Sequence, residues 1–469
     1  MAVQAPKQPN LDSVTTINRD GSHHFLHTAD VKGKWTTARR AFGAVLIAVY
    51  VMLPWIPVNG SPALFFDVEH RRFHIFGLTL VPQDLWVIFF GITGLGFALF
   101  FVTALLGRLW CGWACPYTVF LDHVFRRIER FTEGDAVMRR KLDAAPWSAG
   151  KIARRGTKHL LYFVCSALIA HVFLSYFVSI PRLYQHMQEG PLAHASAFGM
   201  VAFLTGALWF CFGWFREQFC VIMCPYGRLQ SALTDDDTVV IGYDERRGEP
   251  RGAKDKTSGA CIDCRRCVNV CPTGIDIRNG LQLECIGCAA CIDACDDIME
   301  KIGRPKGLVR YDSMKGLAGK KRRILRPRVI AYTVLGVLGL SAFVIAGYFH
   351  ARPFTVDFTR MRGPAFYADA TAIRNHYQIR VHNKRNQTAR FTLHLAGAPE
   401  GFSLSGADAV VEVPPRGEIT RPAIVVIPAH AYRGASDLGL EVRLEPGGIV
   451  LRHKLRFLGP ESNPNLSTP

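Results

Sequence analysis

The sequences CIDCRRCVNVCP (residues 261–272) and CIGCAACIDAC (residues 285–295) contain eight cysteines in two runs of identical spacing. In each run, three cysteines are separated by two residues each, and a fourth follows after a longer gap. This is the spacing with which bacterial two-cluster ferredoxins bind 4Fe-4S clusters through thiolate sulfur. The pattern therefore predicts a ferredoxin-like module with two 4Fe-4S clusters that carries electrons.

The fourth cysteine of each run is expected to bind the other cluster, as in two-cluster ferredoxins. We therefore assign two crossed ligand sets, which are Cys261, Cys264, Cys267 and Cys295 for one cluster and Cys285, Cys288, Cys291 and Cys271 for the other. A zinc site and a disulfide framework are alternatives, because both also use closely spaced cysteines. Zinc ribbons commonly use two pairs of cysteines, so two runs of four favour clusters.

Five apolar runs are each about 20 residues long, which is the length that crosses a bilayer. They cover residues 41–58, 85–106, 160–179, 195–215 and 329–349. The first run begins too far into the chain for a removable signal, and it lacks a small-residue cleavage site. We therefore expect a multi-pass membrane protein that contacts membrane lipid through a five-helix transmembrane bundle.

The distribution of Lys and Arg predicts the orientation of these spans. The segments before residue 41, from 107 to 159 and from 216 to 327 contain 6, 11 and 20 basic residues, whereas the loops 59–84 and 180–194 contain two and one. Cytoplasmic flanks collect positive charge, so we expect the N-terminus and the cysteine module in the cytoplasm and the C-terminal segment outside. The cytosol also keeps thiols reduced, and no cysteine follows Cys295.

The segment after the fifth run contains short alternating stretches that predict strands. They cover residues 377–382, 391–395, 409–413, 424–427 and 440–444, and their spacing predicts a small antiparallel sandwich. The polar residues 1–40 predict an N-terminal tail, and residues 235–259, rich in Asp, Arg, Gly and Lys, predict a linker into the cysteine module. The expected order is the tail at 1–40, four spans at 41–234, the ferredoxin-like module at 235–327, a fifth span at 328–349 and the all-β domain at 350–469.

Two further cysteine pairs, Cys111 with Cys115 and Cys220 with Cys224, each follow an even-numbered span and precede a Pro-Tyr dipeptide. They lie 109 residues apart, so the first four spans resemble two repeated hairpins whose equivalent ends meet. A residue before proline avoids the helical region, so we expect Cys115 and Cys224 where the helix unravels. The four thiols could form a copper site, an additional iron-sulfur site, or a redox-active or structural set, since thiolates favour Cu(I).

The remaining cysteines, Cys165 and Cys211, lie within spans without a spaced partner, and we expect them to be inert packing residues. The formal net charge of +18 lies mostly on loops that flank the spans, such as 126–127, 139–141 and 320–323. This placement favours attraction to the membrane surface, and we expect no binding of nucleic acid.

Together, these features resemble the CcoG family, also called FixG or RdxA. The resemblance covers nearly the whole chain and is carried by WCGWACP (residues 110–116), REQFCVIMCPYGR (residues 216–228) and the eight cluster cysteines. The C-terminal segment, with Asn383 after the strand at 377–382, resembles the immunoglobulin-like domain of that family. The expected fold is therefore a multi-domain membrane protein with a five-helix bundle, a cytoplasmic two-cluster ferredoxin-like insert and a C-terminal all-β immunoglobulin-like sandwich.

The resemblance implies an accessory protein in the bacterial inner membrane for the assembly of cbb-type cytochrome c oxidase, with its C-terminal domain in the periplasm. It also implies an oxidoreductase that reduces Cu(II) to Cu(I). Our hypothesis for the mechanism is that electrons pass from an unidentified cytoplasmic donor through the two clusters to Cu(II) bound near Cys111, Cys115, Cys220 and Cys224. A copper chaperone or exporter would receive the product. Two alternatives remain open, namely a non-catalytic assembly or redox-sensing factor and an electron conduit to another membrane partner. Membrane ferredoxins of nitrate and nitrous oxide reduction share the Cys-x3-Cys-Pro motif, so the motif alone does not select the pathway.

Overall fold

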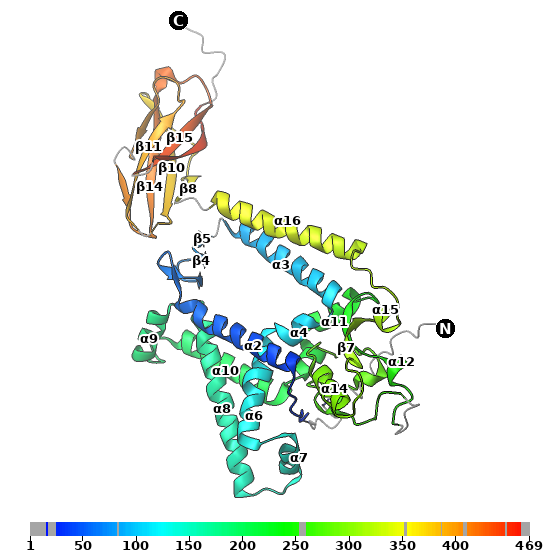
Figure 1. Cartoon of the computed structure of the whole chain (residues 1–469). Coiled ribbons are helices and arrows are strands. Elements are labelled where there is room, and N and C mark those ends of the chain that lie inside the picture. The colour runs from blue at the N-terminus through cyan, green and yellow to red at the C-terminus, as the bar shows by residue number, and fades with distance from the viewer. Residues whose placement is uncertain are drawn as a thin grey trace. The chain divides into compact units, whose positions relative to one another are not determined.

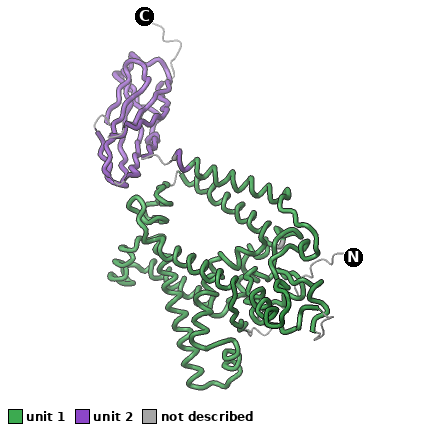
Figure 2. The backbone as a smooth tube through the Cα atoms, viewed as in Figure 1, with its two compact units in different colours: residues 1–346 green, residues 347–469 purple. Residues whose placement is uncertain are grey.

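The computed structural model describes residues 16, 25–81, 84–252, 259–350, 354–385, 387–406, 410–445 and 448–460. The chain divides into two compact units, residues 1–346 and residues 347–469 (Figure 2). Unit 1 contains the long helices, apart from the last turn of the fifth, and both cysteine runs, and unit 2 consists mainly of strands.

Five helices are long and apolar enough to cross a membrane, as expected from the sequence. They are α2 (Lys34–Met52), α3 (Leu85–Leu106), α8 (Ala149–Leu174), α10 (Ala195–Phe210) with its π-helical continuation η4 (Cys211–Phe215), and α16 (Pro327–His350). Two of them begin earlier than the expected starts at residues 41 and 160. Both early segments are basic, and long Lys and Arg side chains can extend from a helix end into the polar interface.

Helices α3 and α16 lie side by side (Figure 1). Their contact is very close at two glycines, since a Cβ atom on Gly94 would lie 2.6 Å from the backbone nitrogen of Leu340, and one on Gly339 would lie 2.7 Å from the Cα atom of Gly94. Small residues let helix backbones approach in this way inside a bilayer, where tight packing replaces the hydrophobic effect. A side chain at either position would push the two helices apart.

Short elements fill both ends of the long helices. At one end are the three-stranded antiparallel sheet of β3 (Leu64–Asp67), β4 (Arg72–Ile75) and β5 (Leu78–Leu80), the two-stranded pair β1 (Pro57–Val58) and β2 (Ser61–Pro62), and α9 (Ile180–Glu189). At the other end are α4 (Leu109–Trp113), α5 (Pro116–Phe120), η3 (Leu121–Phe125), α6 (Arg126–Glu133), α7 (Ala136–Ala144), η5 (Phe219–Met223) and α11 (Pro225–Leu233). The second group carries both membrane cysteine pairs.

The cysteine module is built around α13 (Arg266–Asn269), η6 (Ile277–Asn279) and α14 (Ala290–Lys301). Strand β6 (Val239–Tyr243) pairs with β7 (Val309–Ser313) in antiparallel register, Val239 opposite Ser313 and Tyr243 opposite Val309. The buried side chains of Ile241, Ile292 and Met299 join the two strands to α14 in one apolar core. The interpretation of residues 235–259 as a linker is therefore wrong for β6 and α12 (Glu245–Gly248), which belong to the folded module, while residues 253–258 lie outside the described residues.

Unit 2 consists of two antiparallel sheets. One has the order β12–β14–β10–β8, with β9 also paired to β10, and the other has the order β13–β11–β15–β16. The strands are β8 (Phe354–Arg360), β9 (Tyr367–Ala368), β10 (Ala372–Asn383), β11 (Ala389–Ala396), β12 (Ser403–Ser405), β13 (Val411–Val413), β14 (Glu418–Pro428), β15 (Ser436–Glu445) and β16 (Ile449–Phe457). Inward side chains of both sheets, among them Phe354, Phe391 and Phe457, form one buried core, as in a β-sandwich.

All five expected strand positions fall on observed strands, although Ala409 lies outside the described residues. Strands β8, β9, β12 and β16 were not expected. Asn383 is the last residue of β10. Its Nδ2 atom donates to the carbonyl oxygens of Gln387 at 2.8 Å, Pro414 at 3.1 Å and Val413 at 3.2 Å. This buried amide therefore ties one sheet to the turn that leaves the other.

Candidate functional site

Cys261, Cys264 and Cys267 of the first run line one cavity together with Cys295 of the second run. The cavity contains about 370 Å³ of space, and its lining also includes Tyr243, Met299 and Leu308. Cys261 and Cys267 are buried, Cys295 is half-buried, and Cys264 is exposed. This cavity therefore reaches the protein surface at Cys264.

Cys285, Cys288 and Cys291 of the second run line another cavity together with Cys271 of the first run. This cavity contains about 320 Å³ of space between Ile241, Ile275 and Ile277. Cys288 and Cys291 are buried, and Cys267 borders both cavities. The structure thus brings together the same two groups of four cysteines that the ferredoxin spacing predicts.

The buried thiols of the module fit metal clusters better than single ions. Burial raises the pKa of Cys285 to about 12 and that of Cys288 to about 11, so both hold protons at neutral pH until a cation displaces them. Among the described residues, no three His, Cys, Asp or Glu side chains lie close enough to hold one metal ion. Four sulfurs around a single zinc ion would lie about 4 Å apart, given a Zn–S distance of about 2.3 Å. Each of the two cavities instead brings together four cysteines in the ferredoxin-like pairing, which suits a 4Fe-4S cluster bound by four thiolates.

The second cysteine of each membrane pair occupies the same local structure. Cys115 has φ −61° and ψ 121° directly before Pro116, the first residue of α5. Cys224 has φ −69° and ψ 111° directly before Pro225, the first residue of α11. Both residues are extended, as the restriction before proline predicts, and each begins a new helix with proline at its first position.

All four membrane-pair thiols lie close enough for their charges to interact. The electrostatic neighbours of Cys220 include Cys115, Cys111 and Cys224, and those of Cys111 include Cys115 and Cys224. Burial raises the pKa of Cys111 to about 11, while Arg108 and Gln230 act in the opposite direction. The amide of Gln230 donates to the Sγ atom of Cys111 at 3.4 Å. The two pairs are therefore joined in one group, which we call the membrane thiol set.

The membrane thiol set lies directly beside the second cavity. A Cβ atom on Gly112, between Cys111 and Cys115, would lie 3.0 Å from the backbone nitrogen of Cys288 and would also meet the carbonyl oxygen of Ile286. A Cβ atom on Gly287 would lie 3.3 Å from the carbonyl oxygen of Arg108. Only glycine lets these two loops approach backbone to backbone.

Two hydrogen bonds hold the same contact. The indole nitrogen of Trp113 donates to the hydroxyl of Tyr311 at 3.2 Å, and that hydroxyl donates to the carbonyl oxygen of Gly287 at 2.5 Å. Trp113 belongs to the first membrane pair's helix α4, Gly287 to the second cysteine run, and Tyr311 to β7. The connection thus fixes the cysteine module against the membrane thiol set.

Comparison with known proteins gives three matching regions. Residues 215–314 match the family described as 4Fe-4S dicluster domain, residues 87–143 match the 4Fe-4S binding domain, and residues 344–460 match the Ig-like fold at the C-terminus of FixG. Protein RdxA of Cereibacter sphaeroides is 34% identical over 458 residues, which cover 92% of this chain and 97% of RdxA. The chain belongs to the FixG/RdxA family.

Two further members of the FixG/RdxA family show the same likeness. Protein RdxB of Cereibacter sphaeroides is 34% identical over 92% of this chain and 95% of RdxB. Nitrogen fixation protein FixG of Rhizobium meliloti is 34% identical over 76% of each chain. With the 4Fe-4S families and the five apolar helices, these matches identify the chain as a multi-pass iron-sulfur electron-transfer protein of the FixG/RdxA family.

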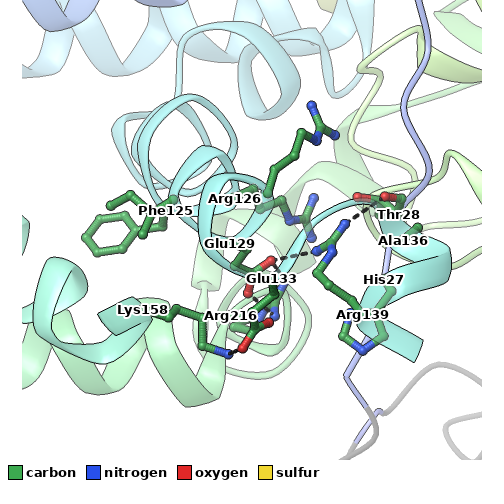
Figure 3. A network of polar contacts seen from close by, with 12 residues as sticks. His27, Thr28, Phe125, Arg126, Glu129, Glu133, Ala136, Arg139, Lys158 and Arg216 are labelled. Atoms are coloured by element: carbon green, nitrogen blue, oxygen red, sulfur yellow. Dashed lines mark hydrogen bonds and ion pairs between the residues drawn. The ribbon is translucent and has the colours of Figure 1, made fainter. Parts of the chain in front are cut away.

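This FixG/RdxA chain also contains a buried ion-pair network that sequence analysis did not predict (Figure 3). Arg139 donates to Glu129 at 2.8 Å and Arg216 donates to the same carboxylate at 2.7 Å, all three side chains being buried. Although burial favours the neutral acid, Arg216 and Arg139 lower the pKa of Glu129 to about 2. Arg126 extends the network by donating to Glu217 and, at 2.9 Å, to the carbonyl oxygen of Pro272.

The network joins parts of the chain that are far apart in sequence. Glu129 lies on α6, Arg139 on α7 and Arg216 directly after η4, while Pro272 follows Cys271 of the cysteine module. The sequence signal was present in the charged Arg216-Glu217 pair beside an apolar span, where unpaired charges are costly. Their partners could not be chosen from the sequence, because many basic and acidic residues lie in the same loops.

Proposed function

We propose that this chain is a membrane-bound cupric reductase, in which Cys111, Cys115, Cys220 and Cys224 bind Cu(II) as substrate. Cu(II) gains one electron and becomes Cu(I), and a one-electron donor in the cytoplasm supplies that electron. The proposal assigns Cys261, Cys264, Cys267 and Cys295 to one 4Fe-4S cluster and Cys271, Cys285, Cys288 and Cys291 to the other. When bound, such clusters supply one-electron chemistry at low potential.

The contact of Gly112 with the backbone of Cys288 is the observation that carries this proposal. Gly112 lies between two cysteines of the membrane thiol set, and Cys288 lines the second cavity. The first cavity instead opens to the surface at the exposed Cys264. The arrangement supports entry of electrons at Cys264 and delivery at the membrane thiol set.

The chemistry of the membrane thiol set supports copper as the substrate. Thiolate is a soft ligand that favours Cu(I), so a site of this kind stabilises the product of reduction. Copper binding must displace the thiol proton of Cys111, and the positive charge of Arg108 assists that loss. The thiols must also move together to hold one ion, and the π-helical turn at Cys220 is a local irregularity of the kind found at functional sites.

An additional iron-sulfur cluster is a second candidate for the membrane thiol set. The match to the 4Fe-4S binding domain covers residues 87–143 and so includes Cys111 and Cys115. Iron content separates the two candidates, since two clusters bring ~8 irons per chain and three bring ~12.

The proposal places the protein in a bacterial inner membrane with the cysteine module in the cytoplasm and unit 2 in the periplasm. The excess of Lys and Arg on the loops that carry the cysteines supports this orientation. By family likeness, we propose cbb-type cytochrome c oxidase as the enzyme whose assembly is served and a copper chaperone or exporter as the acceptor of Cu(I).

The test uses the purified, full-length, iron-loaded protein under anaerobic conditions. After reduction of the protein, stoichiometric Cu(II) should reoxidise it, and a Cu(I)-specific chelator should detect the product. Cys111→Ser and Cys220→Ser should stop this reaction while leaving the iron content unchanged. Cys165→Ser and Cys211→Ser serve as matched controls, because both thiols lie outside the set. Unchanged copper reduction in Cys111→Ser and Cys220→Ser would favour a non-catalytic assembly or sensing role, or electron transfer to another partner.

A further inference from the structure

A cavity with an unusual excess of positive charge lies between the start of α2, α6 and the cysteine module. It contains about 620 Å³ of space, and its charged lining consists of six arginines and two aspartates, with His123 beside them. The arginines are Arg39, Arg40, Arg126, Arg127, Arg130 and Arg139, and the aspartates are Asp30 and Asp122. We call it the arginine cavity.

Four of these arginines have carboxylate partners. Arg39 pairs with Asp122, and Arg126 donates to the same carboxylate at 2.8 Å. Arg130 pairs with Asp30, and Arg139 donates to Glu129 outside the cavity. These ion pairs hold the walls of the cavity in place. The two residues of each pair come from different segments of the chain or from successive turns of a helix.

The other two arginines, Arg40 and Arg127, have no carboxylate partner among the residues that the structure describes. Arg40 makes one long hydrogen bond of 3.5 Å to the carbonyl oxygen of Val31, and its buried Nε atom has no acceptor. Burial and the neighbouring charge of Arg40 both lower the pKa of Arg127. Asp30 and Asp122 act on Arg127 in the opposite direction, but each of these carboxylates is already paired with another arginine. The two guanidinium groups therefore repel one another in the cavity without an ion pair of their own among the described residues.

We propose that the arginine cavity binds a phosphate group, supplied either by an anionic phospholipid headgroup or by a soluble phosphate compound. Phosphate presents several acceptor oxygens and at least one negative charge, which match the forked donors of two or more guanidinium groups. A membrane source fits the place of Arg40 near the start of the first span, and a soluble source fits the contribution of Val270 and Pro272 of the cysteine module to the lining.

The arginine cavity lies beside both the cysteine module and the membrane thiol set, so a bound anion would act on both sites. Pro272, which follows Cys271, and Ala290, which lies between Cys288 and Cys291, both line it. Arg39 also donates to the carbonyl oxygen of Gly112 at 2.5 Å, and Gly112 lies between Cys111 and Cys115 of the membrane thiol set. Bound phosphate would thus add negative charge beside both sites and disfavour their gain of electrons.

Binding is tested on the full-length, iron-loaded protein without copper, so the result is independent of the proposed reductase activity. Inorganic phosphate and pyrophosphate are titrated by calorimetry in detergent, with potassium chloride at equal ionic strength as the salt control. In a second arm, the protein is placed in nanodiscs of phosphatidylcholine with or without phosphatidylglycerol, and its thermal unfolding is compared.

Arg40→Gln and Arg127→Gln should weaken binding by roughly tenfold to a hundredfold, the range expected for lost charged hydrogen bonds. Arg154→Gln is the matched control, because Arg154 is exposed on α8 and does not line the cavity. Arg127→Lys, which keeps the charge but loses the fork, should weaken binding less than Arg127→Gln and tests the site if a glutamine variant fails to fold.

Each outcome decides the proposal or its source. Saturable binding of phosphate or pyrophosphate that is lost in Arg127→Gln supports a soluble ligand. Stabilisation by phosphatidylglycerol alone, again lost in Arg127→Gln, supports a lipid headgroup. The phosphate site is overturned if potassium chloride produces the same heat of binding or the same shift in thermal unfolding. It is also overturned if Arg154→Gln abolishes these effects as strongly as Arg127→Gln does.

Discussion

Cys271 and Cys295 each line the cavity formed by the other cysteine run. Cys271 lies with Cys285, Cys288 and Cys291, whereas Cys295 lies with Cys261, Cys264 and Cys267. Helix α14 allows Cys295 to join the cavity of the first cysteine run. Cys291 and Cys295 lie one turn apart on this helix, and each lines a different cavity. A single helical turn therefore connects the exposed cavity to the buried one.

The crossed arrangement of Cys271 and Cys295 predicts which cysteine substitutions have the same effect. Cys295→Ser and Cys264→Ser should show the same electron paramagnetic resonance spectrum and the same loss of iron, because both cysteines line the exposed cavity. Cys271→Ser should instead resemble Cys288→Ser. Each variant should lose ~4 irons per chain, the content of one 4Fe-4S cluster. A spectrum of Cys295→Ser that matches Cys288→Ser would contradict the crossed assignment.

Gly112→Ala should separate electron delivery from cluster assembly. The added Cβ atom would lie 3.0 Å from the backbone nitrogen of Cys288, so the two loops must move apart. Overpacking of this kind typically costs about 1–3 kcal/mol. We expect normal iron content but slower Cu(II) reduction, measured by stopped-flow reoxidation of the reduced protein.

Gly96→Ala provides the control for this experiment. Gly96 lies on α3, and an added Cβ atom would meet nothing within 4 Å. This variant should reduce Cu(II) at the rate of the unmodified chain. Equal rates for Gly112→Ala and Gly96→Ala would mean that the close approach of Gly112 and Cys288 is not needed for electron delivery.

Patterns that depend on neighbouring residues were readable from the sequence. The apolar runs gave the five long helices, because length and composition alone decide whether a helix can cross a bilayer. The prolines after Cys115 and Cys224 gave the extended cysteines, because the restriction is local. The alternation in unit 2 gave strands within β10, β11, β13, β14 and β15 for the same reason.

Features that depend on residues far apart in the sequence could not be predicted from the sequence. The sequence alone predicts a linker where strand β6 lies, since its five residues stand in a polar segment and its partner β7 is far along the chain. Burial of Ile241 and Tyr243 against the cysteine module is what makes this segment a strand. The network at Glu129 and the arginine cavity were missed because each collects side chains from several segments that only the fold brings together.

Glu129→Gln should destabilise unit 1 at neutral pH and should have less effect in acid. The substitution leaves Arg139 and Arg216 buried without their carboxylate, and losing one partner of a buried pair costs about 3–5 kcal/mol. The folded-state pKa of Glu129 is about 2, below the ordinary value of 4.5. Its contribution is therefore complete above about pH 4.5 and is lost as the pH falls towards 2.

Thermal unfolding of the detergent-solubilised protein across this pH range measures the effect. The difference in Tm between the unmodified chain and Glu129→Gln should be large at pH 7 and should shrink below about pH 4.5. Glu300→Gln is the control, because Glu300 is exposed and pairs with Lys306 at the protein surface. A difference in Tm that stays constant with pH would show that the charge of Glu129 does not stabilise the network.

Asn383→Ala should loosen unit 2 without disturbing the cysteine module. The buried side-chain amide donates hydrogen bonds to three carbonyl oxygens. Without these hydrogen bonds, each carbonyl group that stays buried and unsatisfied costs about 1–3 kcal/mol. Limited proteolysis of the full chain should therefore cut unit 2 faster, while iron content stays constant because Asn383 lies in the other compact unit. Gln378→Ala, exposed on the same strand β10, is the matched control and should be cut at the original rate. Equal cutting of the two variants would mean that this amide does not hold the sandwich together.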